Sequence, residues 1–385
     1  MYIVTVPNTA RAFLRGQVEA LKNAGFEVVL VATPTSLLWE FGEQNNIDVF
    51  GIPMARKISP WSDIKALWLL IKLIREQKPD IVNAGTPKAG LVGMLAACFA
   101  HVPVRIYQLR GLRFETTVGF RRSVLTLTER IAARCAHKIV CNSKSLCQTF
   151  LNHHLAPPQK LIVLGHGSSN GVDPERFLPS HSLLADAARL RNELGIPNNA
   201  RVLGYVGRFT KDKGIVELIE TYDQILQTYP NTHLLLVGDF ENGDPVPPKV
   251  RERIISDPKI KYTGFVRDVA AYYHIMDVLL FPSYREGLPN VPLEAAVAGI
   301  PTIGFKTTGV VDAVKDGETG ILVSLGDINA LSHATLQLLS DSKLRRRLGL
   351  NAQKWVLANF KPEDVWQNWI EFYSQCLHND VLAKG

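Results

Sequence analysis

The sequence has few cysteines and no long apolar run. Its 385 residues contain five cysteines, an odd number, and none of them forms a Cys-x-x-Cys pair. This favours free thiols in a reducing compartment over a disulfide framework or a zinc site. The best apolar stretch, Leu91 to Ala100, is interrupted by Gly93 and is too short to cross a membrane. Because the N-terminus also lacks the basic and apolar regions of a signal peptide, we expect a cytoplasmic protein.

Several nucleotide-binding motifs are absent too. There is no GxxxxGK[ST] phosphate loop, and no GxGxxG follows the first predicted strand, which weakens the case for a bound NAD. No set of histidines, cysteines and carboxylates has the spacing of metal ligands. We therefore expect neither a metal nor a bound cofactor.

The charge of the chain is uneven. The formal net charge is +7, and residues 1–170 contain 20 Lys and Arg against 10 Asp and Glu. A basic first half suggests anionic partners such as phosphates or acidic lipid headgroups, although a scattered, solvated surface is an open alternative. No clustered basic tract or recognition module indicates nucleic acid.

Short β-branched or apolar runs alternate with helical patterns along both halves of the chain. In the first half, the predicted strands are residues 2–6, 27–32, 80–83, 104–108, 138–141 and 161–164, and the helices are 13–24, 63–77, 89–100, 123–135 and 144–151. In the second half, the strands are 201–206, 233–237, 260–263, 278–281, 301–305 and 320–323, and the helices are 214–227, 266–273, 291–297 and 330–339. This alternation predicts parallel sheets covered on both faces.

The two series imply two doubly wound α/β domains. The segment 165–171 is rich in small turn residues, so we place the boundary there, with domains at 1–170 and 171–360. A last helix, 361–380, carries four aromatic residues and is expected to pack back onto the first domain. In open α/β sheets, ligands bind beyond the carboxyl ends of the strands. Two such domains that face one another across a cleft would hold two substrates between them.

The stretch from Phe281 to Pro301 contains two carboxylates near a predicted helix start. Glu286 lies in the loop before the helix and Glu294 in its first turn or so. Ionised carboxylates accept hydrogen bonds from sugar or ribose hydroxyls. The alternative is that both glutamates have no ligand and simply stabilise the positive N-terminal end of the helix dipole.

The segment Gly204 to Gly214 places two cations after a glycine turn. Arg208 and Lys213 precede a predicted helix, where they could bind a diphosphate and stabilise charge on a leaving phosphate. The alternative is that both are ordinary surface cations.

Three motifs in this order resemble those of retaining glycosyltransferases. EGLPNVPLE matches their Glu-x7-Glu element, VGRFTKDKG is similar to their Gly-Arg-x4-Lys-Gly loop, and NGVDPERF resembles the segment at their domain join. The whole chain resembles glycosyltransferase family 4, whose architecture is GT-B, two Rossmann-like domains facing across a cleft. The resemblance is strongest over residues 165–323 and weaker over 1–164.

This resemblance implies roles for individual residues. Arg208 and Lys213 would bind the donor diphosphate, Glu286 would hold the transferred sugar, and Glu294 would hold the ribose. The remaining implied donor-binding residues are Gly207, Val266, Gly287, Leu288, Pro289 and Asn290. The family needs no metal, which agrees with the absence of an Asp-x-Asp motif.

The first domain departs from the family pattern. Its first loop begins Pro7-Asn8, and the histidine that many relatives carry has no clear counterpart. Asn8, Lys88 and Arg110 are the candidate contacts to acceptor or donor; for Arg110, a plain surface cation is an equal alternative. The segment from Trp61 to Lys72 is expected to be a core-facing helix, or else a contact with a membrane interface.

We therefore predict a retaining, metal-independent glycosyltransferase. It would move a sugar from a nucleotide-diphosphate sugar, most simply UDP-linked, to a glycan or polyprenyl-diphosphate-linked acceptor in cell-surface polysaccharide synthesis. Peripheral contact with the anionic inner face of the plasma membrane is part of this expectation. The alternatives are a UDP-sugar 2-epimerase of the same architecture and a non-catalytic sugar-nucleotide-binding protein.

Overall fold

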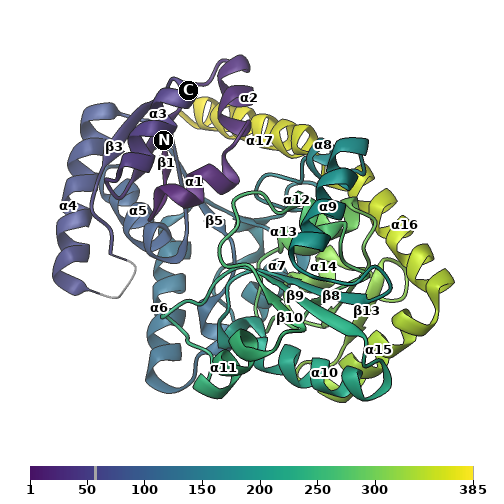
Figure 1. Cartoon of the computed structure of the whole chain (residues 1–385). Helices are drawn as coiled ribbons and strands as arrows, with labels where there is room; N and C mark the ends of the chain where they lie inside the picture. Colours follow the sequence, from purple (N-terminus) through teal and green to yellow (C-terminus); the bar gives the residue numbers. More distant parts are fainter. Residues whose placement is uncertain (56–58, 385) are drawn as a thin grey trace. The chain divides into compact units, whose positions relative to one another are not determined.

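Both halves of the chain form parallel β-sheets covered by helices (Figure 1). The computed structural model describes residues 1–55 and 59–384, with side chains described as far as residue 378. The chain divides into two units: unit 1 comprises Met1–Gly171 and the segment from Pro362 onward, and unit 2 comprises Val172–Lys361. Each unit therefore has its own sheet and its own core.

Unit 1 contains a seven-stranded parallel sheet in the order β3-β2-β1-β4-β5-β6-β7. Its strands are β1 (Tyr2–Ile3), β2 (Val29–Ala32), β3 (Asp48–Gly51), β4 (Ile81–Gly85), β5 (Val104–Leu109), β6 (Lys138–Cys141) and β7 (Leu161–Ile162). Its helices are α1 (Pro7–Phe13), α2 (Gln17–Asn23), α3 (Ser36–Asn45), α4 (Pro60–Gln77), α5 (Pro87–Phe99), η1 (Arg113–Thr116), α6 (Gly119–Cys135), α7 (Lys144–Asn152), η2 (Pro158–Lys160) and α17 (Pro362–Lys384).

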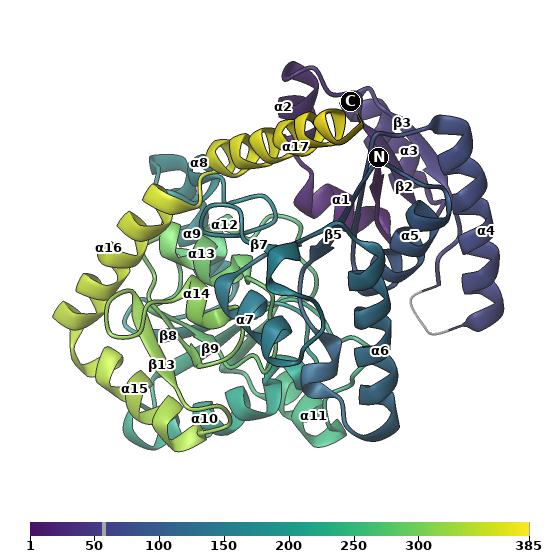
Figure 2. The same cartoon turned by 180° about the vertical axis from the view of Figure 1, so that it is seen from behind.

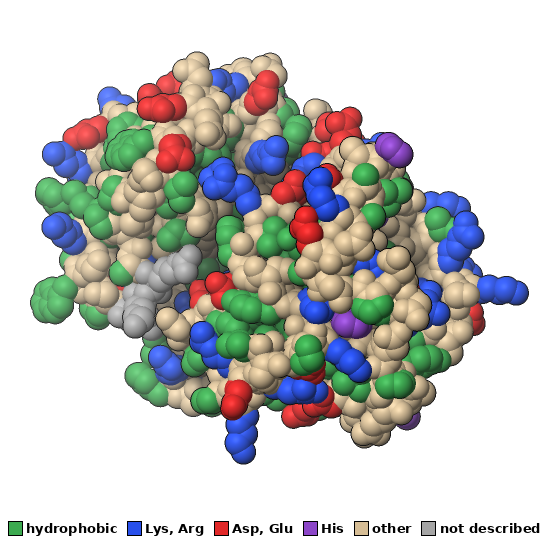
Figure 3. All heavy atoms as spheres, viewed as in Figure 1, with side chains coloured by type: hydrophobic (Ala, Val, Ile, Leu, Met, Phe, Trp, Pro, Cys, Tyr) green, Lys and Arg blue, Asp and Glu red, His purple; other side chains and the backbone are tan. Residues whose placement is uncertain are grey.

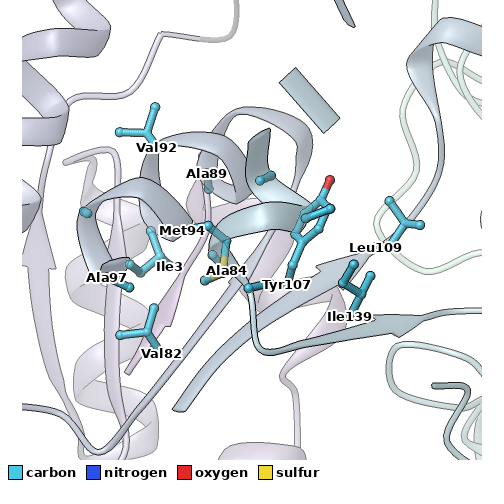
Figure 4. Close-up of a cluster of buried hydrophobic side chains, with 14 of the residues drawn as sticks. Ile3, Val82, Ala84, Ala89, Val92, Met94, Ala97, Tyr107, Leu109 and Ile139 are labelled. Atoms are coloured by element: carbon cyan, nitrogen blue, oxygen red, sulfur yellow. The ribbon is translucent and has the colours of Figure 1, made fainter. Parts of the chain in front are cut away.

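Small residues let α5 lie close to the sheet of unit 1. Figure 4 shows Ala89 and Ala97 of this helix beside Ile3, Ala84 and Tyr107 of the strands. A Cβ on Gly90 would lie only 2.3 Å from the Tyr107 ring, so a larger residue there would push the helix away. Helices α4 and α6 pack on either side of α5, and seven of its 13 residues are buried.

The helix α17 closes the other face of the same sheet. Trp369, Phe372 and Tyr373 are buried together with residues of β1, β2 and α2, and Figure 2 shows α17 lying beside α2. The Tyr373 hydroxyl accepts a hydrogen bond from the amide of Asn83 at 2.6 Å and donates one to the Tyr2 hydroxyl at 2.9 Å. This terminal helix thus belongs to the core of unit 1.

Unit 2 contains a six-stranded parallel sheet in the order β10-β9-β8-β11-β12-β13. Its strands are β8 (Arg201–Val206), β9 (Thr232–Val237), β10 (Ile260–Tyr262), β11 (Val278–Phe281), β12 (Thr302–Phe305) and β13 (Gly320–Val323). Its helices are α8 (Pro174–Phe177), α9 (His181–Glu193), η3 (Lys211–Lys213), α10 (Ile215–Thr228), α11 (Pro248–Ser256), α12 (Ala270–Tyr273), α13 (Asn290–Val297), α14 (Val310–Ala313), α15 (Ile328–Ser340) and α16 (Ser342–Asn359).

The strand orders place a topological switch point in each sheet. The chain moves outward in one direction through β1, β2 and β3, and then returns to place β4 on the other side of β1; β8 and β11 stand in the same relation in unit 2. Ligands of doubly wound folds bind at this point, outside the carboxyl ends of the strands. The loops after β8 and β11 are therefore where chemistry is expected in unit 2.

Four local predictions were wrong. The expected helix 13–24 starts only at Gln17, as α2, since Phe13 ends α1. The expected loop at Pro7-Asn8 instead opens α1, because Pro is well suited to the first helical position. The expected helix 266–273 is reduced to α12, since Gly264 with φ +71° and the segment after it form a loop. Trp61 and Trp68 do not face the core: they are 85% and 63% exposed.

No helix in the described part of the chain is both long and apolar enough to span a membrane. The five cysteines are unbridged.

Candidate active site

A glycine links two loops at the switch point of unit 2. The chain leaves β8, passes through η3 and enters α10 at Gly214, which has φ +70°. A Cβ there would lie 1.9 Å from the carbonyl oxygen of Pro282, in the loop after β11. Only glycine permits both this backbone conformation and this approach. The two loops are thereby held together where their polar residues meet.

Lys213 and Glu286 form the centre of the site. The Lys213 ammonium lies 2.5 Å from a carboxylate oxygen of Glu286, and each side chain is only 14% exposed. The Ser283 hydroxyl donates to the same oxygen at 2.8 Å. Two residues 73 positions apart, one from the loop after each strand of the switch point, are therefore joined in one partly buried ion pair.

A second ion pair supports the first. The Arg285 guanidinium donates to Asp212 at 2.7 Å, and Thr210 donates to the other carboxylate oxygen of Asp212 at 2.6 Å. Burial opposes ionisation of Asp212, but the hydrogen bond from Thr210 and the charges of Lys213 and Arg285 outweigh it and lower its pKa. Asp212 thus stays charged and anchors both loops beside Lys213.

Arg208 lies on the same edge of the sheet but is more exposed. It forms an ion pair with Glu241, and the exposed fraction of its side chain is 58%. The hydroxyl of Tyr205 holds the Arg208 carbonyl at 3.0 Å, which fixes the backbone while the side chain stays accessible. The structure therefore does not bring Arg208 into direct contact with Lys213 and Glu286.

Glu294 has a partner of its own. It lies in the second turn of α13, and its carboxylate accepts a hydrogen bond from the Tyr273 hydroxyl at 2.7 Å. Burial raises the pKa of Glu294, and it raises that of Tyr273 well above its ordinary value. The second glutamate is therefore held by a tyrosine from α12, a residue that the sequence motif does not include.

The other predicted donor residues lie on the same edge of unit 2. Gly287 packs against the loop after β12, where a Cβ on Gly309 would lie 2.5 Å from the Gly287 carbonyl oxygen. Leu288 is buried, and Pro289 and Asn290 begin α13, whose first turn has no side-chain cap. Gly207 follows β8 directly with φ +148°, and Val266 packs against the core beyond β10.

In unit 1, Arg110 directly follows β5, and its guanidinium lacks partners for two of its nitrogens in the described part of the chain. Its guanidinium donates to Gln108 at 2.7 Å and lies 4.7 Å from the centre of the Phe13 ring. Its Nε and Nη1 atoms are shielded from solvent and have no hydrogen-bond partner within the described residues. Burial lowers the pKa of Arg110 to about 10, so it remains cationic at neutral pH. A buried charge without a counter-charge is costly, which distinguishes Arg110 from a plain surface cation.

Lys88 and Asn8 lie in different surroundings. The Lys88 ammonium is paired with Asp63 of α4 at 2.6 Å, and Asn8 is exposed on α1. Thr5 and Thr86, at the switch point of unit 1, share a hydrogen bond of 2.6 Å, and Thr86 has φ +94°, which is unusual for a β-branched residue.

Both halves of the chain match profiles of glycosyltransferases. Residues 8–167 match the glycosyl transferase 4-like domain and residues 186–355 match glycosyl transferases group 1. The capsular polysaccharide biosynthesis glycosyltransferase CapM of Staphylococcus aureus is 37% identical over 98% of this chain and 97% of its own length. The chain belongs to glycosyltransferase family 4. Family membership selects sugar transfer over the epimerase and the binding-only alternatives.

Two further proteins place this family 4 glycosyltransferase among its relatives. An Escherichia coli enzyme, UDP-Gal:alpha-D-GlcNAc-diphosphoundecaprenol alpha-1,3-galactosyltransferase, is 28% identical over 89% of this chain and 87% of its own. Anabaena HepE, solved in complex with UDP-glucose, superposes with a TM-score of 0.79 over 97% of this chain and 98% of that one, at 22% identity. The likeness to HepE confirms the GT-B fold.

The sequence did not predict several residues that hold the candidate site together. Ser283 and Arg285 lie in the stretch 281–301 that contains both glutamates. Their polar side chains beside Glu286 could therefore have marked them as candidate site residues. Tyr273 comes from α12 and Glu241 from the segment after β9. Neither carries a signal in the sequence, because only folding brings them to Glu294 and Arg208.

Proposed function

We propose that this glycosyltransferase moves a sugar from a UDP-linked donor to a polyprenyl-diphosphate-linked acceptor in the synthesis of a cell-surface polysaccharide. The observation that carries the proposal is the Lys213–Glu286 pair at the switch point of unit 2. The UDP-glucose bound to HepE and the names of CapM and the E. coli relative support the substrates. The unbridged cysteines support a cytoplasmic site of action.

The donor would lie against the carboxyl edge of unit 2. Lys213 and the accessible Arg208 would bind the diphosphate, and the carboxylate of Glu286 would accept hydrogen bonds from hydroxyls of the sugar. Glu294, fixed by Tyr273, would hold the ribose hydroxyls. The loop residues Gly207, Val266, Gly287 and Leu288, with Pro289 and Asn290 at the start of α13, would complete the donor site.

Transfer would proceed without a metal ion and with retention. The bond from the anomeric carbon to the diphosphate oxygen breaks, a bond from that carbon to the acceptor oxygen forms on the same face, and the acceptor proton passes to the departing phosphate. Lys213 and Arg208 supply the positive charge that stabilises the leaving group. Preorganised cations in a partly buried site act more strongly than they would in water.

The acceptor would lie on unit 1, with Arg110 as its phosphate contact. The Nε and Nη1 atoms of Arg110 have no protein partner among the described residues, so they would donate to phosphoryl oxygens once the side chain turns toward the acceptor, which would compensate its charge. The excess of Lys and Arg in residues 1–170 supports an anionic acceptor. Asn8 and Lys88 would act as neighbouring contacts.

The test combines binding and turnover. A thermal-shift screen of UDP-, GDP-, ADP- and dTDP-sugars is expected to show stabilisation by a UDP-sugar, because a ligand that binds only the folded state raises its stability. The same donor, incubated with polyprenyl-diphosphate sugar in EDTA, is expected to yield a product with the anomeric configuration of the donor. Activity that returns only with Mg²⁺ would refute metal independence, and an inverted product would refute retention.

A further inference from the structure

The helix α4 carries an exposed apolar and basic stripe. Trp61, Ile64 and Trp68 are 85%, 58% and 63% exposed. They lie three or four residues apart, so they share one side of the helix. Lys65, Lys72 and Arg75, all exposed, fall on the same side. We call these six residues the α4 stripe.

The α4 stripe is not needed for packing. The core-facing side of the helix is formed by Ala66, Leu70, Leu73 and Ile74, which are buried against the rest of unit 1. In Figure 3, hydrophobic and basic side chains alternate along the edge of the molecule where Figure 1 draws α4. Large apolar side chains exposed in a row mark an interaction surface more often than isolated ones do.

The charges around the stripe favour an anionic partner. Of the nearby acids, Asp63 is paired with Lys88 at 2.6 Å, and Glu76 lies 3.8 Å from Lys72 at the margin of the stripe. Lys65 and Arg75 make no ion pair within the described residues. Tryptophan is favoured at the level of lipid headgroups, and Lys and Arg interact with anionic lipid phosphates.

We propose that the α4 stripe docks unit 1 on an anionic lipid bilayer. Trp61, Ile64 and Trp68 enter the headgroup region, and Lys65, Lys72 and Arg75 contact lipid phosphates. The helix lies in the plane of the membrane surface and does not cross it. This deepens the proposed function, since an enzyme seated on the bilayer meets a lipid-linked acceptor by diffusion in two dimensions.

A second apolar pair lies on the other flank of α5. Val118 and Phe120, at the start of α6, are each 84% exposed, and Arg121 and Arg122 follow them. Because α4 and α6 pack on opposite sides of α5, unit 1 presents exposed apolar and basic residues on both helices. The same chemistry on two helices separated by α5 fits an extended lipid surface better than a narrow peptide.

The experiment measures co-sedimentation of the full-length protein with vesicles of equal parts phosphatidylglycerol and phosphatidylcholine, without substrates. The native protein is expected to bind these vesicles, to bind pure phosphatidylcholine vesicles much more weakly, and to lose affinity as salt rises. The variant Trp61→Ala/Trp68→Ala is expected to bind about tenfold or more weakly, because it loses the apolar area that enters the interface. Trp39→Ala is the matched control, since Trp39 is 48% exposed on α3 and lies off the stripe.

Kinetics provide the second measurement. The double variant is expected to lose activity on a polyprenyl-diphosphate acceptor embedded in vesicles while it keeps kcat/KM on a water-soluble short-chain acceptor. Equal vesicle binding by the native protein and the double variant would overturn the proposal. A concentration-dependent dimer that the double variant abolishes, with vesicle binding unchanged, would overturn it in favour of a second copy of this chain. Vesicle binding without transfer to any acceptor would refute the proposed function and leave the docking surface standing.

Discussion

Units 1 and 2 have the same strand order around their switch points, yet their carboxyl edges carry different chemistry. In unit 2, Lys213 is paired with Glu286 and Arg285 with Asp212, so positive and negative groups are matched across two loops. In unit 1, Arg110 lies between Gln108 and Phe13 with two nitrogens unpartnered. A common scaffold fixes where the loops meet, and the loop residues decide what they bind.

Each unit also contains a tyrosine that donates a hydrogen bond to a glutamate, but the two pairs have different roles. In unit 1, Tyr107 donates to the buried Glu129 at 2.6 Å; in unit 2, Tyr273 donates to Glu294 at 2.7 Å. Glu129 is buried between β5 and α6, whereas Glu294, on α13, belongs to the proposed donor site. The same pair therefore affects the stability of unit 1 and, we infer, substrate binding in unit 2.

The largest expected effect comes from breaking the matched pair of unit 2. Lys213→Ala should lower kcat by about 10²–10³-fold, because it removes a preorganised cation from the departing diphosphate. Steady-state kinetics at saturating donor measure this. Lys211→Ala, an exposed lysine two residues away, is the control and should keep full activity. If Lys213→Ala keeps kcat within threefold of the native value, the assignment of Lys213 is wrong.

A somewhat smaller effect concerns the buried carboxyl of unit 1. Burial raises the pKa of Glu129 to about 7, above its ordinary value of 4.5. Between these values the unfolded chain is ionised while the folded one holds its proton, so the free energy of unfolding falls as pH rises, by up to about 3 kcal/mol. Glu129→Gln should remove this loss. Urea unfolding midpoints of the native protein and of Glu129→Gln at pH 5 and pH 8 measure this loss of stability. The same pH dependence in both proteins would contradict the prediction.

The smallest expected effect concerns Arg110, the cation of unit 1 that has no counter-charge within the described residues. Arg110→Gln should raise KM for the diphosphate-linked acceptor about 10- to 100-fold, the value of one or two charge-assisted hydrogen bonds, and leave KM for the donor unchanged. Arg121→Gln, an exposed arginine on α6, controls for long-range electrostatics. A rise in the donor KM instead would move Arg110 to the donor side. A lower melting temperature with both KM values unchanged would make it a structural residue.

Sequence patterns identified the elements that carry the donor motifs. The strand 201–206 and the strand 278–281 coincide with β8 and β11, because central strands buried on both faces read as continuous apolar runs. The patterns failed at α1 and at the segment before α12, where proline, glycine and loop contacts decide the ends of helices. They also favoured a core-facing position for Trp61 and Trp68 over the alternative of a membrane contact, and the core-facing position is wrong. Periodicity identifies the two sides of a helix but not which of them packs against a neighbouring element.

The sequence by itself determined the α/β class, the family and the identity of the two glutamates and two cations in the motifs of unit 2. Tertiary structure alone decided that Lys213 contacts Glu286 while Arg208 pairs with Glu241. It also decided that Tyr273 holds Glu294, and that two guanidinium nitrogens of Arg110 are shielded from solvent without a partner among the described residues. The reason is physical. Local patterns reflect backbone preference and burial, which neighbouring residues set. The partners of a charged side chain are brought together by the crossing of strands that lie far apart in the chain.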